Sequence, residues 1–213
     1  MTWTEKQTFT ITNFLGINFL NDTYLVYGDY PDITTGKTTG VIMQSPRLDM
    51  NAYRTTLSSG WNFVSLPVQP DDKTISKMLQ DISTNVRIVW GYNNKDKVWL
   101  KYKPSAISNT LDIIESGKGY WFYMNNPVTL TVTGKDASPA VALSNGWNLV
   151  GYGGQESTMN LPANYVIIWG WENGTWKAKA ANTSAQLNVS PLDALNRGKA
   201  YWIKMSTDAT WQQ

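Results

Sequence analysis

Residues Leu57–Pro67 read LSSGWNFVSLP, and residues Leu143–Gly151 read LSNGWNLVG. A second pair of similar stretches follows, one after each of these: GKGYW at Gly117–Trp121 and GKAYW at Gly198–Trp202. Two further pairs lie between them in the same order: VWGY and VWLKY in the first case, IWGW and TWKAK in the second. Similar sequences that recur in a fixed order indicate a repeated structural unit.

The sequence therefore predicts three regions. Residues 53–140 form repeat 1, and residues 141–213 form repeat 2, with a shortened helix. Residues 1–52 form an N-terminal β region, because Thr2–Thr12 alternates polar and apolar residues and Thr23–Gly28 is rich in strand-forming residues. Val41–Met43 predicts one more strand there. The pattern leaves open that this region stands alone or packs on repeat 1.

Each repeat is predicted to be β-rich with little helix. Ile75, Met78, Leu79 and Ile82 follow the spacing i, i+3, i+4, i+7, which predicts an amphipathic helix within residues 71–83, with Asp72 as its N-cap. Asn109–Asp112 and Ser190–Asp193 resemble capping boxes. They predict two short helices, closed by Gly117 and Gly198 in the left-handed conformation.

Short strands, adjacent hairpins and little helix together favour a mainly β fold. We expect two tandem units, each a small sheet or barrel-like structure with short helices, packed with pseudo-twofold symmetry. The turn Glu172-Asn173-Gly174 is shorter than its counterpart at residues 93–97, and Asn-Gly favours a type I′ turn.

Composition excludes several kinds of chemistry. The 213 residues contain no cysteine and no histidine, which rules out disulfides, thiolate nucleophiles, the usual zinc sites and histidine acid–base catalysis. The net charge is +2 and the basic residues are spaced apart, so no nucleic acid partner is expected. No apolar run approaches the ~20 residues that span a bilayer. We expect no metal and no cofactor.

The 11 tryptophans carry the candidate binding residues. Six of them recur in both repeats and are predicted to form the core: Trp61, Trp90, Trp121, Trp147, Trp169 and Trp202. Four other aromatic residues are the candidate ligand-binding set: Trp99, Tyr102, Trp171 and Trp176. The first, second and fourth lie on hairpin arms, and we expect Trp171 to point to the opposite face of its strand from Trp169.

Carboxylates give no catalytic pair. Asp112 and Glu115 lie three residues apart, and a glycosidase needs two carboxylates across a cleft. Asp112 recurs as Asp193, but Glu115 is replaced by Asn196, so capping explains the repeated residue better than catalysis. We expect a protein that is not an enzyme and that has no catalytic residue.

The paired motifs GWN, (V/I)WG(Y/W) and GK(G/A)YW resemble a module found in bacterial secreted and cell-surface proteins as tandem GWNLVG/GKGYWI repeats. The resemblance covers residues 57–213. It implies a non-catalytic extracellular module with no site residue to carry over. The second repeat departs from the pattern in its shortened helix and in GKA.

Three functions remain open from the sequence. The first is a non-catalytic interaction or structural module, extracellular or at the cell surface, with a protein or polysaccharide partner. The second is carbohydrate binding through exposed aromatic residues. The third is self-assembly into a homo-oligomer by strand addition, because the strand near Ala209–Gln213 is shorter than its counterpart Val128–Thr133 and Thr2–Thr12 is a candidate partner strand. The first residues lack a signal-peptide pattern, which is expected of a cytosolic protein or of a mature fragment.

Overall fold

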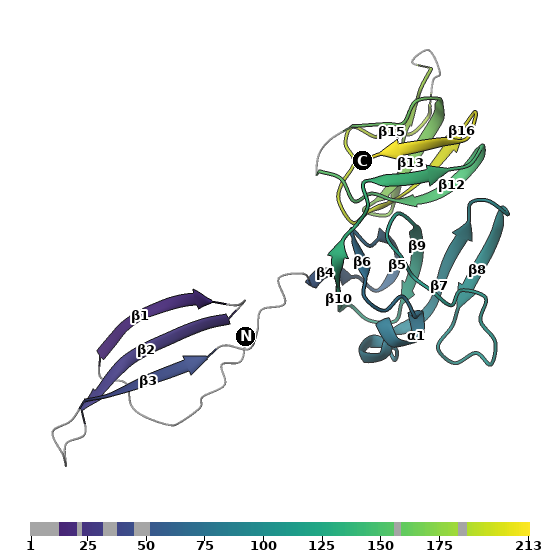
Figure 1. Cartoon of the computed structure of the whole chain (residues 1–213). Coiled ribbons are helices and arrows are strands. Elements are labelled where there is room, and N and C mark those ends of the chain that lie inside the picture. The colour runs from purple at the N-terminus through teal and green to yellow at the C-terminus, as the bar shows by residue number, and fades with distance from the viewer. Residues whose placement is uncertain (1–12, 21–22, 32–37, 45–51, 156–158, 183–186) are drawn as a thin grey trace. The chain divides into compact units, whose positions relative to one another are not determined.

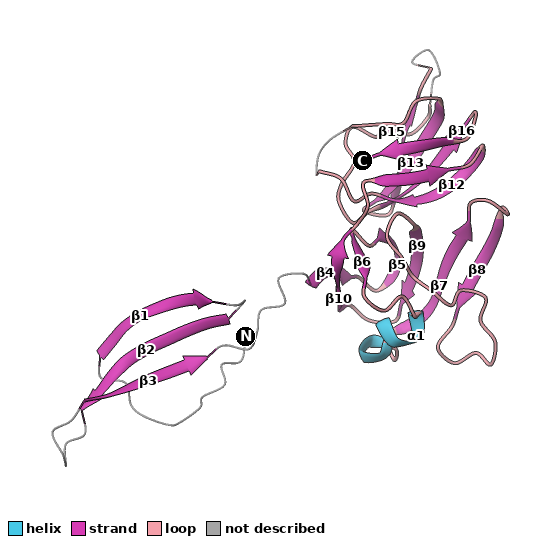
Figure 2. Ribbon diagram, viewed as in Figure 1, coloured by secondary structure: helices cyan, strands magenta, loops and turns pink. Residues whose placement is uncertain are grey.

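The computed structural model describes residues 13–20, 23–31, 38–44, 52–155, 159–182 and 187–213 (Figure 1). The chain divides into two compact units, Met1–Met50 and Asn51–Gln213. The division falls close to residue 52, where the sequence predicts the end of the N-terminal region. The fold is mainly β, as predicted, and strands dominate the ribbon in Figure 2.

The first unit contains a three-stranded antiparallel sheet in the order β1-β2-β3. Its strands are β1 (Asn13–Leu20), β2 (Thr23–Pro31) and β3 (Thr38–Gln44). The strands predicted at Thr23–Gly28 and Val41–Met43 lie inside β2 and β3 and are confirmed. Strand β1 was not predicted, and Thr2–Thr12 lies outside the described residues.

The first half of the second unit contains a four-stranded antiparallel sheet in the order β5-β9-β7-β8. Its strands are β5 (Gly60–Ser65), β7 (Val86–Asn93), β8 (Val98–Tyr102) and β9 (Gly119–Met124). A second sheet in the order β4-β10-β6 lies in the same half. Its strands are β4 (Ala52–Leu57), β6 (Val68–Pro70) and β10 (Val128–Asp136).

The second half has a five-stranded sheet in the order β12-β16-β13-β14-β15 and a two-stranded sheet of β11 and β17. The strands are β11 (Ala140–Leu143), β12 (Gly146–Gly151), β13 (Tyr165–Glu172), β14 (Thr175–Ala180), β15 (Ser190–Pro191), β16 (Ala200–Met205) and β17 (Ala209–Gln212). All these sheets are open, and the described part of the chain contains no closed barrel. The barrel-like alternative is therefore wrong for these residues.

The two halves correspond strand by strand, since β5, β9, β7 and β8 occupy the places of β12, β16, β13 and β14. Their contacts are reciprocal: Val64 bridges Lys199, and its counterpart Val150 bridges Lys118. This exchange is what a pseudo-twofold arrangement produces. That the halves are tandem copies of one module stays a prediction.

Each half has its own hydrophobic core. The first is built from the inward faces of its strands and from Ile75, Leu79 and Ile82. The second contains Ile168, Tyr201 and Trp211 among its buried residues. Period-two alternation supplies each core with its residues, because every second residue of a strand points to the same face.

The helices are shorter than predicted. Helix α1 (Ile75–Met78) and the 3-10 helix η1 (Gln80–Ile82) replace the single helix expected within residues 71–83. Thr74 occupies the N-cap position of α1 without a side-chain capping bond. The Asp72 carboxylate instead accepts a hydrogen bond from the Thr74 N–H at 2.8 Å, in a turn that precedes the helix. Ile75, Leu79 and Ile82 of the predicted apolar stripe are nevertheless buried, and Met78 is partly buried against the same core.

The two short helices predicted after residues 109 and 190 are absent from the described residues. In the first half the Asn109 side chain bonds the backbone of Lys103 in both directions, and in the second half Ser190 pairs with Lys177 in a parallel bridge. The Asn109 side chain and the Ser190 backbone therefore bond at strand edges, and neither residue caps a helix. Gly117 and Gly198 do adopt positive φ, at 74° and 80°, as predicted.

The hairpin turns agree with the sequence. Asn173 and Gly174 both have positive φ, 48° and 79°, which is the type I′ combination. No helix of the described residues is long and apolar enough to cross a membrane.

Candidate functional site

The strands of the second unit carry aromatic side chains on the faces that point away from the two cores. In β7, Val89 is fully buried in the first core, whereas its neighbour Trp90 is only partly buried. In β13 the same relation holds for Ile168 and Trp169. Strand alternation therefore places a layer of rings outside each core.

These rings form a groove with two cavities, which we call the aromatic groove. The first cavity, of about 580 Å³, is lined by Trp61, Trp90, Trp99, Trp121, Trp171 and Trp176. The second, of about 480 Å³, is lined by Tyr92, Trp99, Trp147, Trp169, Trp176 and Trp202. Both volumes lie in the range of small-molecule binding sites.

The two cavities are counterparts of each other. Trp61 in the first corresponds to Trp147 in the second, since both follow the glycine of GWN. Tyr92 and Trp171 correspond because they pair with Trp99 and Trp176 across equivalent hairpins. Applied to the six residues of the first cavity, this correspondence gives the six residues of the second. Trp99 and Trp176 line both cavities.

Contacts between the halves hold the groove together. The rings of Trp121 and Trp171 lie 5.8 Å apart between centroids, and those of Trp99 and Trp202 lie 5.5 Å apart, both pairs edge to face. Buried Phe63 stacks on Trp121 of its own half at 4.2 Å and an angle of 17°, and it meets Trp176 of the other half at 6.0 Å between ring centroids. Each aromatic pair in such a geometry contributes about 0.5–1.5 kcal/mol to stability beyond its buried area. These pairs connect the rings of the two halves into one layer.

Indole N–H groups in the groove are free to bind a ligand. Within the described residues none of the nine groove tryptophans donates a hydrogen bond from its indole nitrogen, and none of these nitrogens on the partly buried rings is sealed from solvent. Trp211 differs: it is 1% exposed and donates from Nε1 to the Asn160 carbonyl at 2.8 Å. The groove therefore combines apolar ring faces with available donors.

Three of the four predicted ligand-binding residues lie in the groove. Trp99 is 49% exposed, and Trp171 and Trp176 are partly exposed beside it. Tyr102 does not join them, because it is buried in the first core. It is three residues from Trp99 in the same strand, and an odd spacing places it on the opposite face. Burial raises the pKa of its hydroxyl.

Two expectations about tryptophan are wrong. None of the six recurring residues predicted as core is buried, and Trp61 and Trp147 are 48% and 38% exposed. Trp169 and Trp171 both contact Trp176, at 6.1 Å and 5.1 Å between ring centroids, so they share a face. Residues two apart in a strand must do so. The six recurring residues instead line the two cavities, three in each.

A third, polar cleft of about 410 Å³ adjoins the first cavity and shares Trp61 and Trp171 with it. Polar side chains line it: Thr56, Ser58, Glu172, Asn173, Asn196 and Lys199. Glu172 forms an ion pair with Lys177 at 2.7 Å, and this contact raises the pKa of the lysine.

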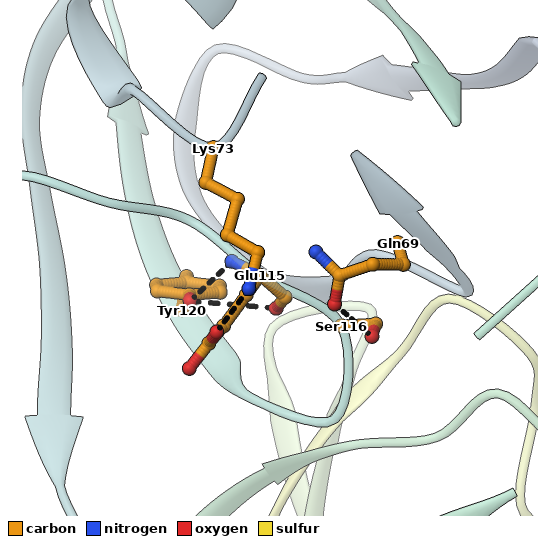
Figure 3. A network of polar contacts seen from close by, with 5 residues as sticks. All are labelled: Gln69, Lys73, Glu115, Ser116 and Tyr120. Atoms are coloured by element: carbon orange, nitrogen blue, oxygen red, sulfur yellow. Dashed lines mark hydrogen bonds and ion pairs between the residues drawn. The ribbon is translucent and has the colours of Figure 1, made fainter. Parts of the chain in front are cut away.

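Glu115, one of the two carboxylates weighed for catalysis, does not line these cavities. Glu115 forms a 3.1 Å ion pair with Lys73, and its backbone N–H donates to the Tyr120 hydroxyl at 3.0 Å (Figure 3). Beside it, Ser116 donates to the Gln69 side-chain carbonyl at 2.8 Å. In the second half the Asn196 N–H donates to Tyr201 in the same way, at 2.8 Å. These contacts order a loop in each half.

Among the described residues there is no group of three His, Cys, Asp or Glu side chains that could hold a metal ion. Comparison of the chain with protein families, with curated proteins and with solved structures found no match.

Proposed function

We propose that the second unit is a non-catalytic binding module that holds neutral carbohydrate in the aromatic groove. The observation that carries this proposal is the pair of corresponding cavities, each walled by six aromatic rings with free indole N–H groups. A pyranose ring has an apolar C–H face, which packs on the electron-rich face of an indole, and a rim of hydroxyls, which accept from indole N–H groups.

The absence of charge from the cavity walls supports a neutral ligand and a non-catalytic role. The lining of both cavities consists only of tryptophan and tyrosine, so no carboxylate lines either of them. A concave, mostly apolar cavity lined by aromatic side chains is the usual form of a ligand-binding site. A protein at the cell surface or outside the cell would meet polysaccharide there, in keeping with the module that the sequence resembles.

Intrinsic fluorescence titrated with a panel of neutral oligosaccharides tests this proposal. Trp99 lines both cavities, so Trp99→Ala is expected to weaken binding by roughly tenfold, the equivalent of about 1.4 kcal/mol. Ile107→Ala is the control, because Ile107 is fully exposed and lines neither cavity. Absence of binding to every glycan, or equal weakening by both substitutions, would contradict the proposal. Binding of a proline-rich peptide in place of sugar would assign the groove to a protein partner.

Self-assembly by strand addition stays a prediction. Strand β17 pairs with β11 within the chain, and the proposed partner strand Thr2–Thr12 lies outside the described residues.

A further inference from the structure

The surroundings of the two corresponding cavities differ at the hairpins. In the first half, the loop between β7 and β8 reaches the edge of β12. The Leu149 N–H donates to Asn94 Oδ1 at 2.7 Å, and Asn94 Nδ2 donates to the Leu149 carbonyl at 3.2 Å. Asn94 is 4% exposed, and Lys97 Nζ donates to the Trp147 carbonyl at 2.9 Å. This loop therefore covers the backbone edge of β12 next to Trp147, which lines the second cavity.

The second hairpin leaves the corresponding place open. Asn173 has the position of Asn94, two residues after Trp171 as Asn94 is two after Tyr92, but it is exposed. Glu172 pairs with Thr175, so only Asn173 and Gly174 form the turn, and this short turn does not reach the edge of β5. The polar cleft occupies the place that Asn94 fills in the other half.

The cleft also presents backbone to a ligand. Phe63 is the counterpart of Leu149, and both pair with the tryptophan of the GK(G/A)YW stretch. The Leu149 N–H points away from β16 and donates to Asn94. Because Phe63 has the same register against β9, its N–H points away from β9, toward the cleft that Phe63 lines. Lys199 and Asn196 add donors, and Glu172 and Asn173 add acceptors.

We infer that this cleft is a polar subsite that extends the first aromatic cavity and has no counterpart at the second. It would take the next units of a sugar chain whose first unit stacks on Trp61 and Trp171, the two rings that the cleft shares with the first cavity. This inference rests on the proposed function. The two cavities bind a disaccharide alike, and only the first gains affinity from a longer chain.

Calorimetry in two matched backgrounds tests the inference. Trp147→Ala leaves the first cavity intact and Trp61→Ala leaves the second, and the two residues are counterparts. The probes are the disaccharide and the hexasaccharide of cellulose, mannan and chitin. In the Trp147→Ala protein the hexasaccharide is expected to bind roughly tenfold more tightly than the disaccharide, as one or two added hydrogen bonds predict. In the Trp61→Ala protein the two lengths bind equally.

Two further variants separate the cleft from the cavity. In the Trp147→Ala background, Lys199→Ala removes the gain with chain length, whereas Lys118→Ala, at the corresponding position outside the cleft, keeps it. Replacing Asn173-Gly174 with the first hairpin's NKDK sequence closes the cleft and also removes the gain, while disaccharide binding persists.

An equal gain with length in both backgrounds, or a gain that survives Lys199→Ala and the loop replacement, would overturn the inference and leave the proposed function standing. Absence of binding to all six probes by the unmodified protein would overturn both.

Discussion

At the scale of single residues, the GWN motif has a structural reason for each of its letters. Gly60 and Gly146 adopt φ of 84° and 81°, which only glycine accepts without strain. The next residue, tryptophan, stands at the rim of the aromatic groove. The asparagine side chain then closes the turn behind it: Asn148 bonds the backbone of Ser144 in both directions, at 2.9 Å and 2.7 Å. One short motif therefore fixes the position of a groove ring.

Burial makes the stability of the second half depend on alkaline pH. It raises the pKa of Tyr201 to about 12, from about 10 in the unfolded chain, and the hydrogen bond from the Asn196 N–H opposes that rise. A raised pKa favours the neutral hydroxyl in the folded state. Its contribution is therefore complete below pH 10 and is lost as the pH rises through 12.

We expect the free energy of unfolding to fall by on the order of 2 kcal/mol between pH 10 and 12 through this group. Urea denaturation at a series of pH values measures the fall. Tyr201→Phe, which cannot titrate, should lower stability at neutral pH by loss of the acceptor for Asn196 but show a shallower fall above pH 10. An unchanged pH slope in this variant would contradict the assignment.

At the scale of elements, the sequence predicts strands better than helices. Strands with period-two alternation and Asn-Gly at their turn are determined locally, and β13 and β14 form the predicted hairpin. The helix within residues 71–83 is cut short by contacts distant in sequence: Thr74 bridges Ile113, and the Ile75 N–H donates to the Asp112 carbonyl at 3.0 Å. Such tertiary pairing leaves no signal in a window of a dozen residues.

The sequence indicates only some residues of the aromatic groove. Trp99 and Trp176 stand out in sequence as aromatic residues on hairpin arms, and both lie in the groove. The usual burial of large aromatic residues predicts a core position for the recurring tryptophans, and this prediction is wrong for all six. Strand alternation indicates the correct placement: Trp61 and Phe63, two residues apart, share one face of β5, whereas the core residue Val64 lies on the other. That the two outer faces meet to form cavities depends on the packing of the halves and has no local signal.

At the scale of the whole molecule, the two halves meet through paired small residues. A methyl group on Gly119 would lie 2.9 Å from the Cβ of Ala200, its counterpart, and 2.8 Å from the Val150 carbonyl. A methyl group on Gly151 would lie 2.5 Å from the Cβ of Ser65, also its counterpart. Each pair therefore has space for one side chain only, which explains why GKG in the first half is matched by GKA in the second.

Gly119→Ala is expected to reduce the free energy of unfolding by about 1–3 kcal/mol, because it overpacks this junction. Adding Ala200→Gly vacates the facing methyl group and should recover part of the loss, though not the contact with the Val150 carbonyl. Ala200→Gly alone is the reference for a double-mutant cycle measured by urea denaturation. Strict additivity of the two changes would contradict contact between the halves at this point.

If the aromatic groove as a whole is the binding surface, a ligand must perturb the indole N–H signals of its tryptophans, which can be followed among the 11 in the chain. These signals are resolved in a ¹⁵N–¹H correlation spectrum and assigned by single Trp→Phe substitutions, then followed as oligosaccharide is added. We predict that signals of the nine groove tryptophans shift with one saturation curve per cavity, whereas that of Trp211, which is buried and bonded to Asn160, stays in place. Saturable binding that leaves the groove signals unmoved would contradict binding in the aromatic groove.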